Sequence, residues 1–391
     1  MNPVAAYDLA PLAIIALVGA SLALGPLAWV WLRHRDARPA ARLRALTVLT
    51  LFLTFDLVLF GAFTRLTDSG LGCPDWPGCY GSVSPLGAHG DIHTAQSALP
   101  SGPVTQGKAW VEMTHRYLAT AVGGLILALT VMSWIEARRR RAGHAKRLPV
   151  SPWWATATLT WVCMQGAFGA LTVTMKLYPA IVTAHLLGGL MLLVLLAAQS
   201  RSYVRAPISL APGLYRAALL LALLCGLQIA LGGWVSTNYA VLACQDFPTC
   251  QGHWWPPMDF DAGFTLQRAL GAGKDGGYLP FAALTAIHYT HRLGAAVVLV
   301  ALGLMAWRLH ASGDRGLQRW AFGLGAVALW QLASGLANVL LGWPLAAAVG
   351  HTAGAAVLVT MLTILITRAR QGMRHPAQSR GLSAGRLRSA S

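Results

Sequence analysis

The stretch Glu112-Met113-Thr114-His115-Arg116 opens an apolar run and follows a long polar segment with two cysteines. Most of this arrangement occurs twice in the chain. The segment Cys73-Pro74-Asp75-Trp76-Pro77-Gly78-Cys79 is matched by Cys244-Gln245-Asp246-Phe247-Pro248-Thr249-Cys250, and His115-Arg116 is matched by His291-Arg292. An internal repeat of this length predicts a duplicated structural unit, and it has to be recognised before the fold is interpreted.

Further residues extend the repeat on both sides of the cysteine loops. A glycine stands at the matching place before each cysteine pair, at Gly61 and Gly232. Each half also has a second histidine, His185 or His351, which follows a short proline-containing turn. Each copy therefore reads as a helix, a long loop, a histidine helix, a further helix, a tight turn and a second histidine helix.

The composition indicates an integral membrane protein. Of 391 residues, 55% are hydrophobic and only 11% are charged, which is far from the usage of soluble domains. Apolar stretches of about 20 residues, enough to cross a bilayer, are predicted at nine places: 11–32, 43–64, 109–135, 152–175, 180–200, 214–236, 283–307, 320–341 and 345–367. We expect an all-α fold with two pseudo-symmetric four-helix transmembrane bundles and one extra N-terminal helix.

The distribution of charge predicts the orientation. The formal net charge is +17, and most of the 30 Lys and Arg residues lie in five segments, at 33–44, 138–147, 201–216, 308–319 and 368–388. With nine spans, all five lie on one side and the cysteine loops on the other. Positive charge marks the cytoplasmic side, so we expect the N-terminus outside and the C-terminus in the cytoplasm. This clustering argues against a nucleic-acid partner.

The repeat and the charge pattern together predict the domain organisation. Residues 1–42 form an extra helix with a basic cytoplasmic loop, and residues 368–391 form a basic cytoplasmic tail. Between them lie two four-helix units, at 43–205 and 206–367. Each unit has an even number of spans, so both have the same orientation in the membrane.

The four repeated histidines are the strongest candidates for a functional site. A buried imidazole in a membrane is costly unless a partner uses it, and two imidazoles on facing helices suit the two axial positions of a haem iron. We expect His115 with His185 to bind one haem, and His291 with His351 another. A zinc or copper site is the alternative, because His288 stands three residues before His291.

Two carboxylates within the apolar runs are candidates for chemistry. Glu112 shares a helix face with His115, and His288 occupies the matching position in the second copy. This difference predicts catalysis in the first unit and a bound cofactor in the second, unless Glu112 is only a charge favoured by the helix dipole. Asp56 is the second candidate, because carboxylates inside membrane helices are usually functional.

The outer cysteines predict disulfides, since these persist outside the cytoplasm. Bridges within each loop, Cys73–Cys79 and Cys244–Cys250, are feasible, although four cysteines also allow pairing between the loops. A structural staple over each histidine site and a dithiol relay that carries electrons both remain open.

With these motifs in place, the chain resembles the haem A synthase family. The resemblance covers residues 61–365 and includes Gly61, the segment Thr64–Gly70, both cysteine loops and the four histidines. It implies eight helices in two halves and oxidation of the C8 methyl of haem O to the formyl of haem A, through a hydroxymethyl intermediate. The extra N-terminal helix and His288 depart from the family's pattern.

The resemblance also implies roles for the individual residues. Haem b would be the cofactor, with His291 and His351 as axial ligands and His288 as a competing candidate. Haem O would be the substrate, near His115 and His185, with Glu112 required for activity. Arg116 and Arg292 are candidates for pairing with haem propionates, and helix capping or snorkelling is an equal alternative.

The implied setting is a bacterial-type inner (cytoplasmic) membrane. The expected partners are haem O, membrane lipid, haem O synthase, cytochrome oxidase assembly factors and a second copy of the chain in a homo-oligomer. Two other functions remain open. One is a di-haem b-type electron-transfer cytochrome, which would not need Glu112. The other is a membrane thiol oxidoreductase, which would not explain the histidines.

Overall fold

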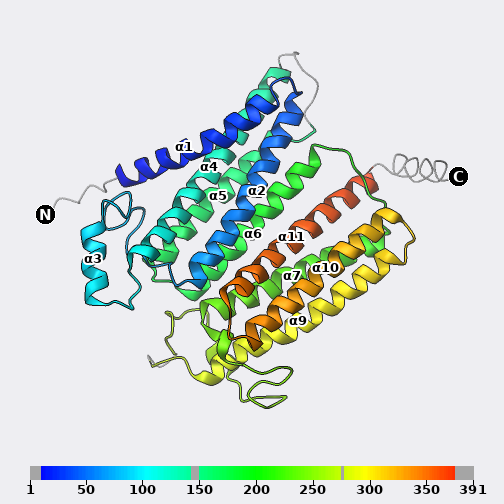
Figure 1. Ribbon diagram of the computed structural model, residues 1–391. Coiled ribbons are helices and arrows are strands. Elements are labelled where there is room, and N and C mark those ends of the chain that lie inside the picture. Colours follow the sequence, from blue (N-terminus) through cyan, green and yellow to red (C-terminus); the bar gives the residue numbers. More distant parts are fainter. Residues whose placement is uncertain (1–9, 142–148, 274–276, 375–391) are drawn as a thin grey trace. The chain divides into compact units, whose positions relative to one another are not determined.

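The computed structural model describes residues 10–141, 149–273 and 277–374, and within them all regular elements are helices. They are α1 (Ala10–Arg33), α2 (Pro39–Leu66), α3 (His89–Ala98), α4 (Gln106–Arg141), α5 (Pro152–Thr174), α6 (Pro179–Ser202), α7 (Pro212–Thr237), the 3-10 turn η1 (Ala240–Leu242), α8 (Phe260–Gly263), α9 (Phe281–His310), α10 (Arg315–Leu340) and α11 (Leu345–Arg374) (Figure 1). The all-α prediction is confirmed. Most of the predicted basic tail, and part of the basic segment 138–147, lie outside these ranges.

Eight of the described helices are long and apolar enough to cross a membrane: α1, α2, α4, α6, α7, α9, α10 and α11. They coincide with eight of the nine predicted spans and indicate a multi-pass membrane protein. The ninth span forms as α5, with 23 residues, but α5 is not among the eight. Its threonines and Gln165 lower the mean hydropathy, so its crossing of the membrane stays a prediction.

Local sequence explains where several helices begin and how they keep polar groups satisfied. Pro39, Pro152 and Pro212 stand at the start of α2, α5 and α7, where a missing N–H removes no helical hydrogen bond. Inside α2, the hydroxyls of Thr47 and Thr50 donate to carbonyls one turn earlier, at 2.7 and 2.8 Å. Such bonds satisfy buried hydroxyls without a partner helix.

The chain forms two compact units, which we describe separately. The N-terminal unit runs to His185, and the C-terminal unit comprises residues 148–150 and everything from Leu186 onward. The boundary near residue 205 that the sequence predicts stays a prediction. Both units expose large apolar side chains on helix surfaces, such as Phe52 and Phe322, as expected where the surrounding solvent is lipid.

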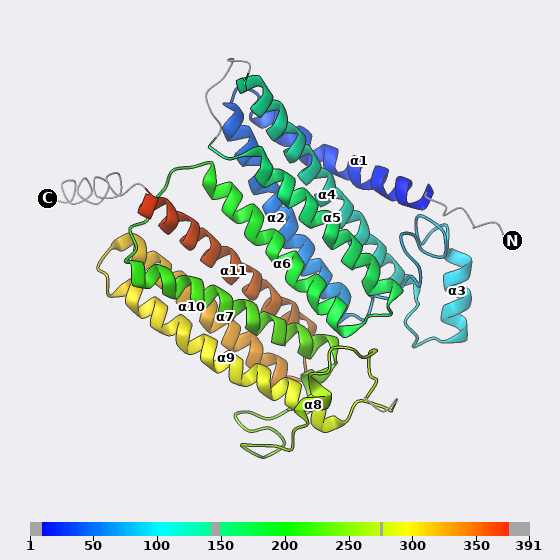
Figure 2. The same ribbon diagram turned by 180° about the vertical axis from the view of Figure 1, so that it is seen from behind.

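In the N-terminal unit, α4 is the central element. Helices α1, α2, α3 and α5 all pack against it, and Figures 1 and 2 show α1 running along α4 in both views. Helix α1 is the added helix predicted from the repeat. The four-helix part of this unit therefore carries one extra packed helix on its outside.

In the C-terminal unit, four helices close a ring. Helix α7 packs against α9 and α11, and α10 packs against the same two helices. Leu221, Leu302, Leu324 and Leu362 are almost fully buried between them. This closed bundle of α7, α9, α10 and α11 corresponds to the second copy of the repeat, and the unit also includes α6 from Leu186 onward.

The tight turns before α6 and α11 are the same structure. Lys176 and Leu177 in the first, and Gly342 and Trp343 in the second, all have left-handed φ angles between 49° and 68°. The Leu177 N–H donates to the Thr172 carbonyl at 2.8 Å, and the Trp343 N–H bonds the matching carbonyl at 3.0 Å. This bond closes a helix C-terminus and sets the position of the histidine that follows.

Candidate functional site

In the N-terminal unit, each repeated histidine lies against a glycine of another helix. A Cβ on Gly61 of α2 would come within 3.0 Å of His115 Cε1, and a Cβ on Gly169 of α5 would come within 3.4 Å of His185 Cε1. Both imidazoles are half-buried, and they lie close enough for a charge on one to act on the other. The ring of Phe60 stacks beside His115 at 6.2 Å between centroids.

The C-terminal unit repeats this arrangement. A Cβ on Gly232 of α7 would come within 3.0 Å of His291 Cε1, and a Cβ on Gly335 of α10 would come within 3.4 Å of His351 Cε1. The imidazoles of His291 and His351 are again half-buried and within electrostatic reach of each other. All four repeated histidines therefore share one feature: the imidazole lies against a glycine of another helix.

This arrangement fits a planar iron-porphyrin better than a compact metal site. The residues that the structure describes contain no group of three or more His, Cys, Asp and Glu residues able to hold a metal ion together, which argues against the zinc or copper alternative. Each unit has two imidazoles, and each imidazole lies against a glycine that lets the neighbouring helix approach the ring. Such a pair suits axial ligation of a haem. The donor set therefore fits one haem in each unit.

The two units differ at the other ring nitrogen of each histidine. In the C-terminal unit, Gln228 Nε2 lies 2.9 Å from His291 Nδ1, and Ser334 Oγ lies 2.9 Å from His351 Nδ1. In the N-terminal unit, the Nδ1 atoms of His115 and His185 are buried and have no hydrogen-bond partner in the described ranges. Sequence reasoning missed Gln228 and Ser334, because comparing histidine positions alone does not reveal their neighbours.

Each cysteine loop is closed by its own disulfide. Cys73 pairs with Cys79 and Cys244 with Cys250, with 4.8 Å between Cα atoms in each pair. This is the pairing within loops that the sequence allowed. Inside each loop an aspartate accepts two backbone N–H groups: Asp75 from Tyr80 and Gly81, and Asp246 from Gln251 and Gly252.

The turn in the second loop has an electrostatic signature. The Thr249 hydroxyl, followed by the backbone N–H groups of Gly252 and Gln251, lowers the pKa of Asp246 from 3.8 to about 2. These donors favour the charged carboxylate because each is bonded to it in the folded loop. The repeated aspartates therefore serve the loop structure.

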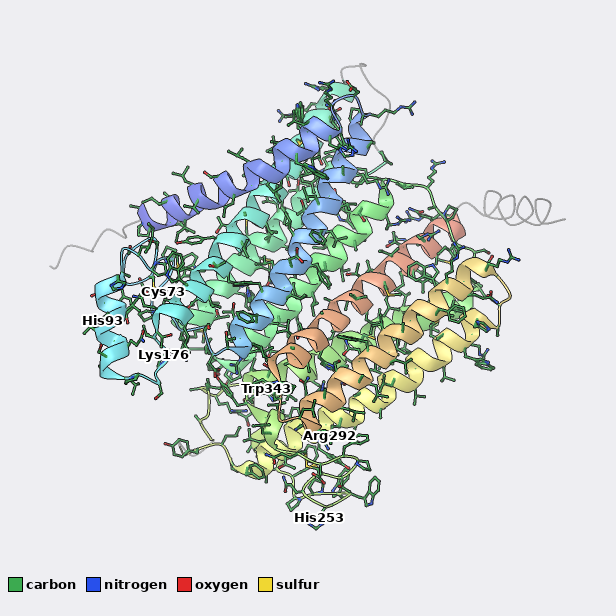
Figure 3. The ribbon with its side chains drawn as sticks, viewed as in Figure 1. Cys73, His93, Lys176, His253, Arg292 and Trp343 are labelled. Atoms are coloured by element: carbon green, nitrogen blue, oxygen red, sulfur yellow. A yellow bond between two sulfur atoms is a disulfide. The ribbon has the colours of Figure 1, made fainter. Side chains whose placement is uncertain are left out.

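Arg116 and Arg292, which directly follow the repeated histidines His115 and His291, hold the disulfide loops. Arg116 donates to the carbonyls of Asp75, Pro77 and Gly78 at 3.0, 3.1 and 2.5 Å. Arg292 donates to the carbonyls of Asp246, Thr249 and Cys244 at 2.8, 2.9 and 2.8 Å, and Figure 3 marks it at the loop end of α9. This role was not among the sequence-based expectations, and pairing with propionates stays a prediction.

Glu112 and His288 occupy the same place beside these arginines. Glu112 is 4% exposed, and its carboxylate accepts hydrogen bonds from the Cys73 N–H at 2.9 Å and from Arg116 at 2.5 Å. His288 is equally buried, and its Nε2 accepts from Arg292 Nε at 3.4 Å. Both residues therefore contact the loop side of the site, one turn before the repeated histidine of the same helix.

Asp56 lies apart from these contacts. Its exposed side chain lines a cavity of about 280 Å³ between α1, α2 and α4, whose other lining residues, Leu57 and Leu118 among them, are all apolar. The matching residue in the C-terminal unit is Leu227. A functional role for Asp56 stays a prediction.

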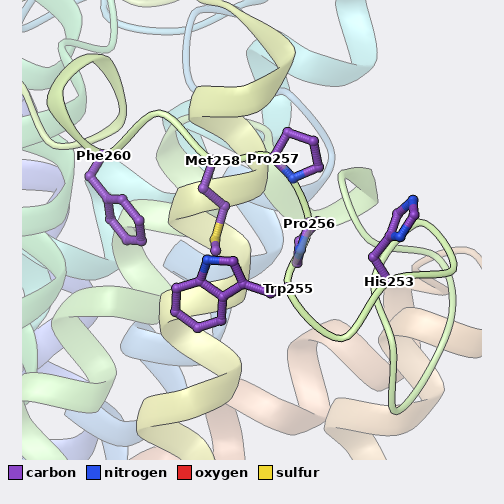
Figure 4. Close-up of a pocket in the computed structure, with 6 residues that line it drawn as sticks. All are labelled: His253, Trp255, Pro256, Pro257, Met258 and Phe260. Atoms are coloured by element: carbon purple, nitrogen blue, oxygen red, sulfur yellow. The ribbon is translucent and has the colours of Figure 1, made fainter.

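A second cavity, of about 410 Å³, lies in the long loop between α7 and α9 of the C-terminal unit (Figure 4). It is lined by His253, Trp255, Pro256, Pro257, Met258 and Phe260. None of the predicted ligands or catalytic residues contributes to it. The candidate site is therefore the set of histidine pairs, and not this open cavity.

Known proteins match this chain over most of its length. The family model described as cytochrome oxidase assembly protein (COX15-CtaA) matches residues 44–363, which leaves out α1. A heme A synthase of Shewanella oneidensis is 37% identical over 322 residues, 81% of this chain and 93% of the relative. A heme A synthase of Methylobacterium radiotolerans is 29% identical over 86% of this chain and 94% of the relative, and one of Halalkalibacterium halodurans is 25% identical over 79% and 91%. This chain therefore belongs to the cytochrome oxidase assembly protein family.

Proposed function

We propose that this protein is a haem A synthase, which oxidises the C8 methyl group of haem O to a formyl group. The observation that carries the proposal is the pair of glycine-backed imidazoles in each unit. Family membership and the similarity to heme A synthases over most of the chain support it. An enzyme of this kind needs one porphyrin as substrate and can use the other as cofactor.

The C-terminal unit is the better candidate for the haem b cofactor, with His291 and His351 as axial ligands. Both have a side-chain partner at Nδ1, as metal-ligating histidines usually do. His291 is favoured over His288 because it lies on Gly232 and near His351, whereas His288 bonds Arg292. When bound, haem b supplies electron transfer.

The N-terminal unit is then the site for haem O, near His115 and His185. Converting a methyl to a formyl group requires two successive oxidations, through a hydroxymethyl group and a gem-diol that loses water. Glu112 is the candidate for moving a proton or stabilising positive charge at the substrate carbon. Its contacts with Arg116 and the Cys73 N–H hold the carboxylate in one position.

Haem extraction from the purified full-length protein tests the proposal. Haem B found together with haem O or haem A, and conversion of added haem O, are the expected results. Haem B alone, at two per chain, would instead identify a di-haem electron-transfer cytochrome. Activity that depends on the outer cysteines, in protein without haem, would identify a thiol oxidoreductase.

We further infer a bacterial cytoplasmic membrane, an N-terminus outside and a cytoplasmic C-terminus, from the distribution of basic residues. A reporter fused near residue 90 is expected to be active outside, and one fused near residue 143 is expected to be silent there. The reverse pattern would overturn this orientation. Haem O synthase, oxidase assembly factors and a second copy of the chain stay predicted partners.

A further inference from the structure

We propose that Gln228 and Ser334 position the two imidazoles of the C-terminal unit so that this site retains its haem. The matching residues of the N-terminal unit, Leu57 and Phe168, leave that site free to exchange its haem. This inference rests on the proposed function, and it assigns to named residues the difference between a cofactor site and a substrate site.

The Gln228 amide is built into the His291 site. Its Nε2 lies 2.9 Å from His291 Nδ1 and also donates to the His291 carbonyl at 2.9 Å, while its Oε1 is buried without a partner. An imidazole that binds iron through Nε2 carries its proton on Nδ1. A half-turn of the amide brings Oε1 to that proton, because the two ends of an amide have nearly the same shape.

Gly294 makes room for this amide. A Cβ at Gly294 would collide with Gln228 Oε1, so a larger residue on α9 would displace the side chain. Gly294 stands three residues after His291, and the residue three after His115 is Leu118. The N-terminal unit thus has Leu57 and Leu118 where the C-terminal unit has Gln228 and Gly294.

Ser334 acts on the second ligand in the same way. Its hydroxyl is 6% exposed, donates to the Trp330 carbonyl at 2.7 Å and lies 2.9 Å from His351 Nδ1. Because its own proton is used by Trp330, the oxygen is available to accept the Nδ1 proton. Ser334 thus has an acceptor in place for His351, and Gln228 offers one to His291 once its amide turns and gives up its bond to the His291 carbonyl.

The N-terminal unit has no such acceptor. Leu57 and Phe168 are apolar, and the Nδ1 atoms of His115 and His185 are buried without a hydrogen-bond partner in the described ranges. The Gln165 carbonyl lies near the His185 ring, but outside hydrogen-bond geometry. Ring orientation at these two histidines is set by packing, against Gly61 and Phe60 at His115 and against Gly169 at His185.

The partner of a ligand imidazole affects how firmly the metal is held. It fixes the tautomer and the ring direction, and it makes the ligating nitrogen a better electron donor; its removal typically costs about 10–100-fold in metal affinity. A site with both partners is suited to a resident haem. A site with neither is suited to a haem that must leave after each reaction.

The test measures haem loss from full-length protein to an excess of a haem-accepting apoprotein. In Gln228→Leu and in Ser334→Ala, haem b is expected to leave about 10–100-fold faster than in the unchanged protein, and its midpoint potential is expected to rise. Gln228→Glu and Ser334→Thr keep an acceptor oxygen and are expected to restore slow loss. Gln318→Leu and Ser312→Ala, at the other end of α10 and in the turn before it, are the matched controls.

The converse change tests the N-terminal unit. The variant Leu57→Gln/Leu118→Gly recreates the Gln228–Gly294 pair beside His115 and is expected to slow the loss of haem O or haem A from the protein. Unchanged rates and potentials in Gln228→Leu and Ser334→Ala would overturn the inference. Absence of haem b from the unchanged protein would instead overturn the proposed function, so the two failures are distinguishable.

Discussion

The loop-facing ends of α4 and α9 share a scaffold but differ in one buried side chain. In both units an arginine binds three carbonyls of a disulfide loop. The residue one turn before it is Glu112 in α4 and His288 in α9. Glu112 also accepts the Cys73 N–H, whereas His288 contacts only Arg292 among the side-chain bonds described for it.

This comparison shows that a carboxylate at the position of Glu112 is not needed to anchor the disulfide loop. The C-terminal unit closes the equivalent disulfide, and its arginine binds three carbonyls of the loop, with an imidazole in place of Glu112. Loop anchoring alone therefore does not explain a buried carboxylate, whose desolvation is costly. Chemistry in the N-terminal unit is the explanation that we favour, and four experiments test the contrast between the two units.

The largest effect is expected at the ligands of the C-terminal unit. His291→Ala or His351→Ala removes one of the two proposed axial ligands, so the bound b-type absorption spectrum is expected to disappear. His288→Ala is the matched control and is expected to keep the spectrum, because His288 faces the loop. Loss of the spectrum in His288→Ala, with a normal spectrum in His291→Ala, would reverse the ligand assignment.

Glu112→Gln is expected to reduce haem A formation by about 10²–10⁴-fold, the usual range for a positioned acid–base group. The amide oxygen can still accept the Cys73 N–H, so the loop is expected to stay closed and the haem b spectrum normal. The readout is haem A formed from haem O by extracted-haem chromatography, with Glu136→Gln as the control. Near-normal activity in Glu112→Gln would show that the carboxylate is structural, and Asp56 would be the next candidate.

Replacing the arginines tests the shared part of the scaffold. Arg292→Lys loses the planar guanidinium that binds three carbonyls. Loss of one charge-assisted hydrogen bond, worth about 1.5–3 kcal/mol, makes opening of the loop roughly tenfold or more frequent. The Cys244–Cys250 bridge is expected to be reduced that much faster by added thiol, while Cys73–Cys79 in the same molecule is unchanged. Arg116→Lys should show the opposite selectivity, and equal effects on both loops would refute separate anchoring.

The smallest effect is the pH dependence of the Asp246 turn. Because folding lowers the pKa of Asp246 from 3.8 to about 2, its stabilisation is complete above the ordinary pKa and is lost as the pH falls through about 2. Amide hydrogen exchange at Gln251 and Gly252, corrected for intrinsic rates, should stay constant between about pH 6 and about pH 4. Loss of protection between about pH 6 and about pH 4 would contradict the assignment. Full protection in Asp246→Asn at neutral pH would contradict it as well.

Much of the architecture could be predicted from periodic and repeated features. Apolar runs predict membrane helices because length and hydropathy are local properties, and the matching cysteine and histidine positions predict two copies of one unit. Helix α5 shows the limit of hydropathy, since it forms as predicted without reaching the apolar level of the other spans. The pairing of Cys73 with Cys79 was feasible from spacing, but the choice among pairings needed the folded loop.

The all-α class, the duplication and the four repeated histidines could be read from residue type and spacing along the chain. The tertiary structure alone decided which groups meet across helices. It placed Gly61 against His115 and Gly232 against His291, the side chains of Arg116 and Arg292 in the loops, and Gln228 beside His291. Such contacts depend on how each helix is rotated and packed. Residues far apart in the chain determine this jointly.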